Sequence, residues 1–332
     1  MEISHCYRRA FRAMGRAKRL LAVCHRRPDG DALGSTAAVL LWCRRQGIAA
    51  KAFCLDPIPP SFGFLPESER FTSDPAVFGE GWDTVVVLDC GDLQRIGHPG
   101  VAGGFPSVGP HQPPTVIAVD HHCTNDGRYA DVSVIDPQAS STAELVLGMF
   151  RENGVTVDCD LATCLLAGVA GDTDMLTNPA ACRSAFRMAS ELLSEGADWR
   201  SAIGLFVRNR SIPSLRLVGR AMARLKVDPQ TGVASTAVFR SDCPDGSDFL
   251  ADGLVDAIGG AMDAEVILVL KERADGTVSG SFRTVGEADT ASVAQRLGGG
   301  GHRKASGFTV TGRIVEREHG WTVEREVAPQ DH

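Results

Sequence analysis

Three short runs of apolar and β-branched residues lie in the first 120 positions of the chain, and none of them alternates with polar residues. They span 20–24, 84–88 and 115–119. Unbroken runs of this length are typical of strands that are covered on both faces of a sheet. Stretches with a helical period lie between and after them, at 32–46, 141–153, 160–170 and 180–193. This alternation predicts an α/β fold with a mostly parallel sheet and helices on both of its faces.

The second part of the chain has a different pattern, in which amphipathic helices are followed by strands. The helices predicted over 198–225 contain no Gly/Ser-rich tract, so they form a connector rather than a flexible linker. Beyond them we expect strands at 233–239, 265–271, 278–283 and 306–310 and helices at 250–259 and 290–297. We therefore predict an N-terminal domain over 1–197, a helical connector over 198–216 and a smaller α/β domain over 217–332.

Acidic residues and histidines follow each of the three apolar runs. The first run leads into His25, Asp29 and Asp31, the second into Asp89, and the third into Asp120-His121-His122. The carboxyl ends of parallel strands meet at one edge of a sheet, where open α/β folds bind their ligands. A histidine pair alone is more often a hydrogen-bonded loop, and Asp-Gly-Asp alone is more often a solvated acidic turn. The three together predict a metal site at that edge.

Asp172 follows a helix that the sequence predicts to be buried, and with Asp29, Asp31 and Asp89 it makes a group of four carboxylates. Four converging carboxylates repel one another unless cations are bound, and two divalent ions cancel their charge. Oxygen-rich ligands with some imidazole suit Mn²⁺ or Mg²⁺, and no thiolate is present to select zinc. We expect Asp89 to bridge the two ions, which activate water for attack on phosphorus. Gly30 is expected to form a tight turn that lets Asp29 and Asp31 reach different ions.

A run of glycines in the second domain is the other candidate site. Consecutive glycines at 298–301 let backbone N–H groups approach a phosphate closely, and His302 adds a donor. Arg283, at the end of a neighbouring predicted strand, can reach the same phosphate or a base. A flexible connector is the alternative interpretation. The small residues at 305–307 favour a binding site.

Composition and charge limit the partners and the cellular compartment that we expect for this chain. The chain has 332 residues, enough for two domains, and a net charge of −7, so no global basic field attracts long nucleic acid. The ten cysteines form no Cys-x-x-Cys pair, which argues against a zinc module or a disulfide framework and favours a reducing cytoplasm. No apolar stretch follows the basic residues at 8–19, so they are not a secretory signal, and no run is long enough to span a membrane. We interpret them as the solvated face of a first helix, with contact to nucleic acid or a membrane surface as the alternative.

Five motifs, in this order, resemble the DHH phosphoesterase superfamily with its DHH-associated C-terminal domain, and within it the NrnA-type nanoRNases and pAp phosphatases. The motifs are His25-x₃-Asp29-Gly-Asp31, Leu88-Asp89, Asp120-His121-His122 with Thr124-Asn125, Asp172-Thr173, and Gly298 to His302. Any one of them is weak, whereas five in the family's order are specific. The resemblance covers essentially the whole chain.

The resemblance implies two groups of metal ligands. His25, Asp29 and Asp89 resemble the ligands of one Mn²⁺, and Asp31, Asp89, His121 and Asp172 resemble those of the other. His122 resembles a histidine that faces the substrate and stabilises the phosphoryl group or protonates the leaving oxygen, so His122 and Asp89 are the catalytic candidates.

Further roles follow from the same resemblance. Asp120 is expected to orient a histidine, and Arg95 is expected to support the site structurally rather than to act in catalysis. The residues that resemble the clamp for the end of the substrate are Arg283, Gly299, Gly300, Gly301 and His302.

The resemblance implies a cytoplasmic, Mn²⁺-dependent phosphoesterase that hydrolyses short oligoribonucleotides, pAp or both to mononucleotides, and it suggests a homodimer. An acidic chain without a basic stripe favours short substrates over long duplex nucleic acid. The alternatives are a phosphodiesterase for cyclic di-AMP or pApA, a RecJ-like single-strand exonuclease, and a catalytically silent nucleotide-binding regulator. The chain leaves no room for a further nucleic-acid-binding domain, and its complete ligand set argues against a silent regulator.

Two features depart from the family pattern. Asp174 stands where the family commonly has glycine, and we prefer a helix cap over an effect on metal affinity as its role. Residues 97–114 are rich in proline and glycine, so we expect an irregular surface excursion there.

Overall fold

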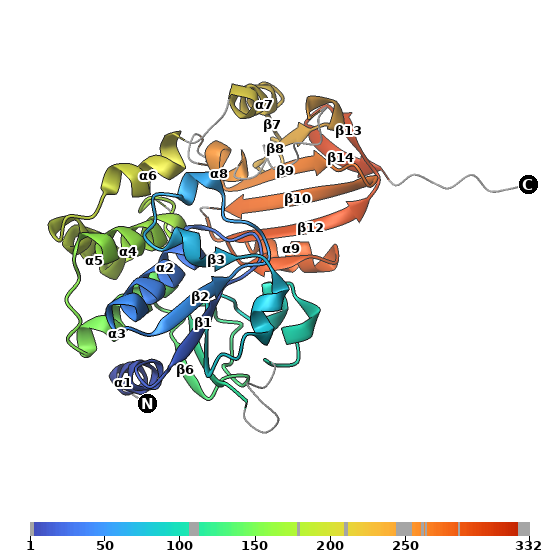
Figure 1. The fold of residues 1–332 in the computed structure, drawn as a ribbon. Helices are drawn as coiled ribbons and strands as arrows, with labels where there is room; N and C mark the ends of the chain where they lie inside the picture. Colours follow the sequence, from blue (N-terminus) through green and yellow to red (C-terminus); the bar gives the residue numbers. More distant parts are fainter. Residues whose placement is uncertain are drawn as a thin grey trace, which may run out of the picture. The chain divides into compact units, whose positions relative to one another are not determined.

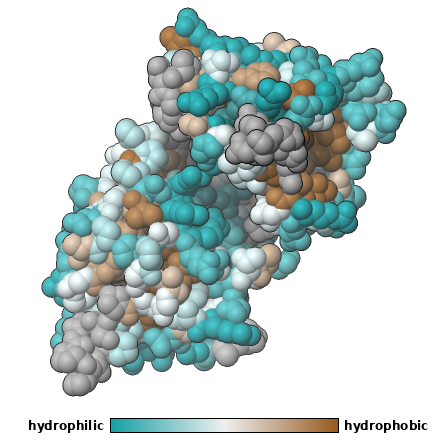
Figure 2. All heavy atoms as spheres, turned by 90° about the vertical axis from the view of Figure 1, so that its right-hand side faces the viewer, coloured by the Kyte–Doolittle hydropathy of each residue, from teal (hydrophilic) through white to brown (hydrophobic). Residues whose placement is uncertain are grey.

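The computed structural model describes residues 3–105, 113–177, 180–208, 212–243, 254–259, 262, 264–284 and 286–324. The chain divides into two compact units, Met1–Asn209 and Arg210–His332, and each is described by itself (Figure 1). Within the described ranges, no helix has both the length and the apolar character needed to cross a membrane. On the face drawn in Figure 2, hydrophilic side chains predominate and hydrophobic ones form patches between them.

The N-terminal unit is built on a six-stranded sheet in which all neighbouring strands are parallel. In spatial order the strands are β3 (Phe71–Thr72), β2 (Ala49–Phe53), β1 (Arg19–Val23), β4 (Thr84–Leu88), β5 (Thr115–Asp120) and β6 (Val132–Ile135). The three apolar runs are β1, β4 and β5, which lie side by side. Along β1, Leu20 packs into the core on one face and Leu21 into the core on the other. The predicted parallel sheet with doubly covered central strands is therefore confirmed.

The α-helices of this unit gather on one face of the sheet, where buried side chains from all six of them share one core. They are α1 (Ile3–Met14), α2 (Gly30–Arg45), α3 (Thr142–Glu152), α4 (Cys159–Asp172), α5 (Arg183–Ser194) and α6 (Trp199–Arg208). The other face is covered by 3₁₀ turns and loops, among them η3 (Pro75–Gly79), η4 (Leu93–Ile96) and η5 (Pro99–Val101). Helices on both faces were expected. The connections on the second face are interrupted by proline and glycine, which limit helical structure to single turns.

Helices α2 and α4 pack against each other with almost no side chain between them. A Cβ atom on Gly34 of α2 would lie 2.3 Å from the carbonyl oxygen of Cys164 in α4. A Cβ atom on Gly168 of α4 would lie 2.8 Å from Asp31 Oδ1, at the start of α2. This close approach brings the first turn of α2 and the last turn of α4 to the same edge of the sheet.

The C-terminal unit contains a smaller mixed sheet with helices, as predicted. In spatial order its strands are β11 (Gly300–His302), β12 (Ala305–Thr311), β10 (Thr277–Thr284), β9 (Val266–Glu272), β8 (Val233–Val238) and β7 (Lys226–Val227). Only the β8–β9 pair is parallel among them. The remaining elements are α7 (Ile212–Ala223), α8 (Leu254–Gly259), α9 (Thr290–Arg296) and the hairpin of β13 (Arg313–Arg317) and β14 (Gly320–Glu324). Short turns at η1 (Pro60–Phe62), η2 (Ser68–Arg70) and η6 (Arg240–Asp242) complete the two units.

Several predicted boundaries shift. The helix predicted at 180–193 begins at Arg183, and the one predicted at 250–259 starts outside the described residues, with α8 covering its second part. Five strands were not predicted: β3, β7, β11, β13 and β14. Part of the excursion at 97–114, residues 106–112, also lies outside the described residues. The division of the chain into two units falls between residues 209 and 210. The domain boundaries drawn from the sequence stay predictions.

Candidate metal centre

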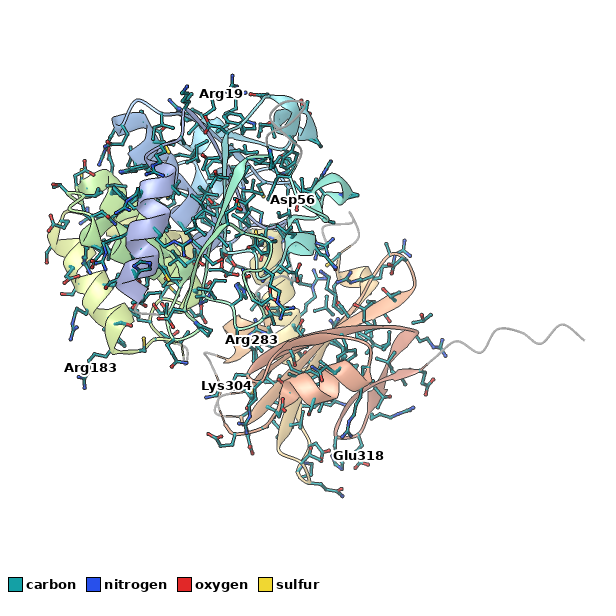
Figure 3. The ribbon with its side chains drawn as sticks, turned by 90° about the horizontal axis from the view of Figure 1, so that it is seen from below. Arg19, Asp56, Arg183, Arg283, Lys304 and Glu318 are labelled. Carbon is teal, nitrogen blue, oxygen red and sulfur yellow. The ribbon has the colours of Figure 1, made fainter. Side chains whose placement is uncertain are left out.

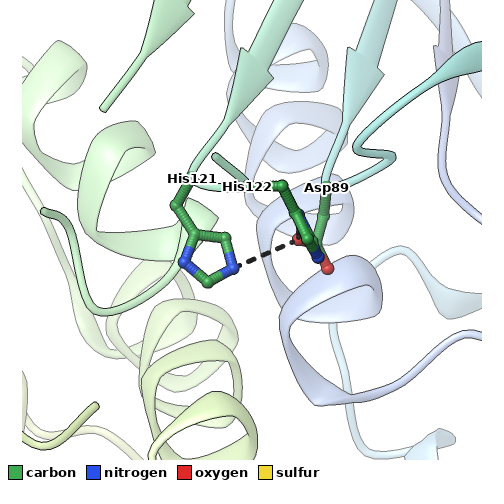
Figure 4. Close-up of side chains that lie close together, drawn as sticks. All are labelled: Asp89, His121 and His122. Atoms are coloured by element: carbon green, nitrogen blue, oxygen red, sulfur yellow. Dashed lines mark ion pairs between the residues drawn. The ribbon is translucent and has the colours of Figure 1, made fainter. Parts of the chain in front are cut away.

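Loops after β1, β4 and β5 bring the predicted ligands together with the end of α4. The candidate ligand atoms form three groups, and within each group the atoms lie within 4.8 Å of one another. They are His25, Asp29 and Asp89; Asp31, His121 and Asp172; and Asp89, His121 and His122. Figure 4 shows Asp89 with the two histidines beside it. All six predicted ligands thus lie in one cluster, and Asp89 belongs to two of its groups.

The first group lies where β1 passes into α2. His25 Nε2 is 3.6 Å from Asp29 Oδ2 and 3.5 Å from Asp89 Oδ2. The other oxygen of Asp29, Oδ1, caps α2 by accepting the backbone N–H groups of Asp31 and Ala32, both at 3.0 Å. The predicted tight turn at Gly30 is wrong, because Gly30 is the first residue of α2. A helix start, with Asp29 before it and Asp31 inside it, separates the two carboxylates instead.

The second group lies between β5 and the end of α4. His121 Nε2 is 2.8 Å from Asp172 Oδ2 and 3.6 Å from Asp89 Oδ1. Asp172 is the last residue of α4, where the sequence pattern places it. Its distance from His121 shows that the ends of α4 and β5 meet, which the sequence alone does not establish.

Two buried histidine nitrogens face carboxylate oxygens of the cluster: Nε2 of His25 and Nε2 of His121. The Nδ1 atom of His25 is 2.8 Å from the carbonyl oxygen of Arg26, and that of His121 is 3.3 Å from the carbonyl oxygen of Ala139. A carbonyl only accepts, so Nδ1 carries a proton, and Nε2 is the nitrogen that a second proton or a metal ion can occupy. A lone pair that faces carboxylate oxygens is repelled unless a cation or a proton lies between them. This arrangement fits a divalent ion, with the carbonyls fixing each ring from behind.

The charges of the cluster have a large effect on both rings. Burial lowers the pKa of His25, but Asp29 and Asp89 raise it, to about 11. Burial likewise lowers the pKa of His121, and the contact with Asp172 raises it, to about 10. The carboxylates thus stabilise a positive charge at the rings of His25 and His121, either as a proton or as a metal ion.

Asp31 is gripped by the start of α3, a relationship that the sequence interpretation missed. Its side chain is fully buried, and it accepts the backbone N–H groups of Thr142 at 2.6 Å and Ala143 at 2.8 Å. Burial, and next the carboxylate of Asp89, raise the pKa of Asp31 well above its usual range. The Thr142 hydroxyl donates to Asp89 Oδ1 at 3.2 Å. One helix start therefore orients two of the candidate ligands.

The start of α3 forms part of a capping box, the motif in which a Ser or Thr before a helix and a Glu three residues later each accept the other's backbone N–H. Ser141 Oγ accepts the backbone N–H of Glu144 at 3.2 Å, as that motif requires. The Glu144 carboxylate, however, accepts from the backbone N–H of Ser140, at 2.8 Å. A helix start placed directly after an outer strand of the sheet was the signal available in the sequence.

His122 is held from both sides. Its Nδ1 is 2.7 Å from Asp120 Oδ1, and its Nε2 is 2.9 Å from Arg95 Nη1. A guanidinium only donates, so Nε2 accepts from Arg95 and Nδ1 carries the proton toward Asp120. Both ring nitrogens are then engaged, although Nδ1 also lies 3.5 Å from Asp89 Oδ1. This geometry favours the substrate-facing interpretation of His122 over a ligand.

Asp120 has the surroundings of an orienting residue. It is fully buried and also accepts the backbone N–H of Gly91 and the Asn125 side-chain amide, both at 2.7 Å. Burial raises the pKa of Asp120, but the hydrogen bond from His122 outweighs it and holds the pKa below its usual value. A carboxylate that accepts this many donors fixes the loop after β5.

Asp89 adopts a left-handed backbone conformation, with a φ of 58°. Residues other than glycine adopt this conformation at a cost, and such residues cluster at functional sites. The conformation turns the chain sharply at the end of β4. It also lets the Asp89 carboxylate lie between His25 and His121.

The glycine run of the C-terminal unit forms the edge strand β11 instead of a loop. A Cβ atom on Gly299 would lie 2.0 Å from the carbonyl oxygen of Gly307, and one on Gly301 would lie 2.6 Å from that of Ala305. A Cβ atom on Gly300 would meet nothing within 4 Å. Strand packing therefore requires the glycines at 299 and 301, and open space for a ligand remains at Gly300.

The strand register places Arg283 close to this run. Arg283 pairs with Ala305, and Ala305 pairs with His302, so the three backbone positions form one row across β10, β12 and β11. Figure 3 shows Arg283 near Lys304, and the backbone N–H of Thr284 donates to the Lys304 carbonyl oxygen at 3.0 Å. The predicted substrate residues of the C-terminal unit thus lie at one end of its sheet.

Asp174 lies in a left-handed turn that follows α4. Its φ is 50°, and those of Met175 and Leu176 are 58° and 65°. Glycine adopts this conformation without the penalty of a Cβ atom, which explains the glycine expected from the resemblance. No group of metal-ligand atoms found among the described residues includes Asp174.

Comparisons with known proteins agree with this geometry. Residues 19–169 match the DHH family, N-terminal domain, and residues 248–319 match the DHHA1 domain. A relative from Thermus thermophilus, the bifunctional oligoribonuclease and PAP phosphatase NrnA, is 29% identical over 298 residues, which cover 89% of this chain and 85% of the relative. A relative from Streptococcus agalactiae, named as a probable manganese-dependent inorganic pyrophosphatase, is 29% identical over 191 residues, which cover 52% of this chain and 54% of the relative.

A solved structure supports the fold. The exopolyphosphatase-related protein from Bacteroides fragilis superimposes with a TM-score of 0.83 at 23% identity, covering 93% of this chain and 92% of that one. The fold, the cluster and the relatives together define a metal-binding hydrolase that acts on phosphoester bonds. The chain thus contains a DHH-family N-terminal domain followed by a DHHA1 domain.

Proposed function

We propose that this chain hydrolyses short oligoribonucleotides, pAp or both to mononucleotides, with two divalent cations of which Mn²⁺ is the first candidate and Mg²⁺ the second. The observation that carries the proposal is the pair of buried Nε2 atoms, in His25 and His121, that face carboxylate oxygens at 2.8–3.6 Å. Each faces a different group of ligand atoms, and Asp89 is near both.

The candidate ligands divide into two sets. One ion would be held by His25, Asp29 and Asp89, and the other by Asp31, Asp89, His121 and Asp172. Bound ions would polarise the phosphoryl oxygens and lower the pKa of water at the site. Asp89 is the proposed bridge because its two oxygens face different histidines.

The other residues of the centre orient these groups. Asp120 accepts a hydrogen bond from His122 Nδ1, which holds the ring in one orientation at the edge of the ligand cluster. The helix start at Thr142 holds Asp31 in place. In the C-terminal unit, we propose that Arg283, the glycine run and His302 bind the end of the substrate away from the reacting phosphate.

The names of two relatives and the net charge of the chain support the proposed substrate class. The Thermus thermophilus relative is named for oligoribonuclease and PAP phosphatase activities and matches most of this chain. The Streptococcus agalactiae relative is named for dependence on manganese. A net charge of −7 gives no general attraction for long nucleic acid. A cytoplasmic location and a homodimer are further expectations, the second of which light scattering of the purified protein tests.

A parallel assay tests the proposal. The full chain is incubated with Mn²⁺ and, separately, with pAp, a diribonucleotide, pApA, cyclic di-AMP and long single-stranded DNA, with Asp89→Asn as the matched control. We expect hydrolysis of pAp or the diribonucleotide and little of the long DNA. A preference for cyclic di-AMP or long DNA would replace the proposed substrate class. Hydrolysis of none of them, with wild type and Asp89→Asn indistinguishable, would overturn the hydrolase itself.

A further inference from the structure

We propose that Arg95, expected from the sequence to be a structural support, binds a phosphoryl oxygen of the substrate directly. The inference deepens the proposed function, on which it rests. Arg95 is then a catalytic residue of the N-terminal unit, and its guanidinium lies beside His122. The ligand it takes is a phosphate monoester or diester anion.

The first observation is the position of the side chain. Arg95 is the third residue of η4, the turn that follows the Asp89 loop, and it is partly buried. Its Nη1 is 2.9 Å from His122 Nε2, and the other ring nitrogen of His122 lies 3.5 Å from Asp89 Oδ1. One imidazole ring therefore separates the guanidinium from the proposed bridging carboxylate.

The second observation is the missing counterion. Among the described residues, no carboxylate oxygen lies within 4.0 Å of the Arg95 guanidinium, although acidic residues crowd this edge of the sheet. Other partly buried arginines are paired: Arg224 contacts Asp242, and Arg70 contacts Glu67 at 2.7 Å. A guanidinium carries five donors and stays charged at any working pH. Its contact with one neutral imidazole nitrogen leaves most of that capacity for an anion.

The third observation is the rigid mounting of the turn. The Asp92 carboxylate caps η4 by accepting the backbone N–H groups of Gln94 at 2.7 Å and Arg95 at 3.0 Å. The carbonyl oxygen of Arg95 accepts the backbone N–H of Arg26 at 2.8 Å, which ties the turn to the loop that carries His25. The backbone is thus held from both ends, and only the side chain has freedom to exchange partners.

Gly91 completes this mounting. Its φ is 63°, and a Cβ atom there would lie 3.5 Å from Arg95 Cδ and 3.6 Å from Arg95 Nη1. The Arg95 side chain therefore passes directly over Gly91 and extends to His122. A phosphate oxygen is a stronger acceptor for a guanidinium than a neutral imidazole nitrogen, because the hydrogen bond is charge-assisted on both sides. We infer that the substrate draws Arg95 from His122 or is bound by its remaining donors.

A purely positioning role for Arg95 makes a different prediction, so the two can be separated. If Arg95 acts only through His122, its loss has no effect once His122 is gone. If it contacts the phosphate itself, its loss weakens anion binding whether or not His122 is present. A double-mutant cycle over the two residues decides between these outcomes.

The experiment measures the affinity of the Mn²⁺-loaded full chain for AMP, the phosphate-monoester product, by calorimetry. The variants are Arg95→Gln, Arg95→Lys, His122→Ala and the double variant Arg95→Gln/His122→Ala. The matched control is Arg128→Gln, which also removes one arginine charge, from a side chain that is 88% exposed. Mn²⁺ affinity and melting temperature are measured for each variant.

We expect Arg95→Gln to weaken AMP binding by about 10- to 100-fold, as for a lost hydrogen bond between charged partners. The same factor is expected in the His122→Ala background, with Arg95→Lys intermediate and Arg128→Gln equal to wild type. Mn²⁺ affinity and melting temperature should stay near wild type. An AMP effect that disappears without His122, or that a loss of Mn²⁺ affinity accompanies, overturns the inference in favour of a structural role.

Hydrolysis by the wild type separates this inference from the proposed function. A wild type that cleaves no substrate but binds AMP through Arg95 overturns the proposed hydrolysis and leaves phosphate binding by Arg95 in place. A wild type that cleaves short substrates while Arg95→Gln binds AMP normally overturns the inference alone. A wild type that binds no AMP contradicts the inference directly.

Discussion

The carboxylate of Asp31 accepts a hydrogen bond of 2.6 Å from the backbone N–H of Thr142, the first residue of α3. The two residues are 111 positions apart in the sequence. The start of a helix carries unpaired N–H groups and a partial positive charge, so it stabilises a buried carboxylate. The contact fixes a candidate metal ligand from α2 by means of α3, and Gly168 of α4 completes the enclosure, since a Cβ atom there would lie 2.8 Å from Asp31 Oδ1.

The first prediction concerns this enclosure. Gly168→Ala should destabilise the protein by about 1–3 kcal/mol, because the new methyl group overpacks the contact between α2, α3 and α4. It should also lower Mn²⁺ affinity by displacing Asp31, without removing any ligand. Thermal unfolding in a chelator and calorimetric titration with Mn²⁺ measure the two effects separately.

Gly219→Ala is the matched control, because Gly219 lies in helix α7 and a Cβ atom there would meet nothing within 4 Å. That variant should gain up to about 1 kcal/mol from the better helix former and bind Mn²⁺ as the wild type does. If Gly168→Ala retained full Mn²⁺ affinity, the proposed link between Asp31 and the metal would be wrong.

The second prediction concerns Asp89. Asparagine tolerates the left-handed φ of 58° observed at this position, so Asp89→Asn should keep the backbone while removing the bridging charge. Hydrolysis should fall by about 10³-fold or more, since a bound metal contributes several kcal/mol to the transition state. The rise in melting temperature that saturating Mn²⁺ gives the wild type should shrink or disappear. An Asp89→Asn protein that Mn²⁺ still stabilises fully would exclude the bridging role.

The third prediction is a release of protons when Mn²⁺ binds. Without metal, the pKa of His25 is raised to about 11 and that of His121 to about 10, so both rings are protonated at pH 8. A metal ion needs the bare Nε2 atoms, so each ring should give up a proton on binding. Mn²⁺ affinity should accordingly rise with pH up to those values.

Calorimetry in buffers of different ionisation enthalpy counts these protons, and about two are expected per loaded centre. The His25→Ala variant is the control, with about one proton expected from the remaining ring. Histidines with an ordinary pKa near 6.5 would release almost none at pH 8. A count near zero for the wild type would therefore contradict the raised pKa values.

The fourth prediction concerns the C-terminal unit. Arg283→Ala and His302→Ala should raise KM for short substrates by about tenfold while leaving Mn²⁺ affinity unchanged, since they are proposed to bind substrate away from the metal ligands. Steady-state kinetics with a diribonucleotide measures the effect. Loss of metal binding in either variant would show that the C-terminal residues have been assigned the wrong role.

The fifth prediction concerns the left-handed turn after α4. Asp174→Gly should leave Mn²⁺ affinity unchanged, because Asp174 belongs to none of the ligand groups among the described residues. Its φ of 50° costs glycine nothing, so stability should stay equal or rise by up to about 1 kcal/mol. A clear change in Mn²⁺ affinity would instead support a role for this carboxylate at the centre.

Much of the fold and most of the candidate centre follow from the sequence for one reason. Uninterrupted apolar runs identify buried parallel strands, and the residue after such a strand must lie at the carboxyl edge of the sheet. The positions of His25, Asp89 and His121 are therefore local consequences of the chain. The cap on α2 is local as well, because an aspartate directly before a helix accepts its first N–H groups, although a tight turn at Gly30 was expected in its place.

Other features depend on contacts between distant segments. Three of them arise where segments far apart in the sequence come together. The start of α3 binds Asp31, Arg95 contacts His122, and strand packing requires glycine at 299 and 301. Periodicity carries no information on such contacts, because it reports only which face of an element is apolar. The sequence by itself determined which residues reach the edge of the sheet. Only the tertiary structure decided how they are oriented and which of them share a neighbour, because hydrogen bonds and close packing act between elements rather than along them.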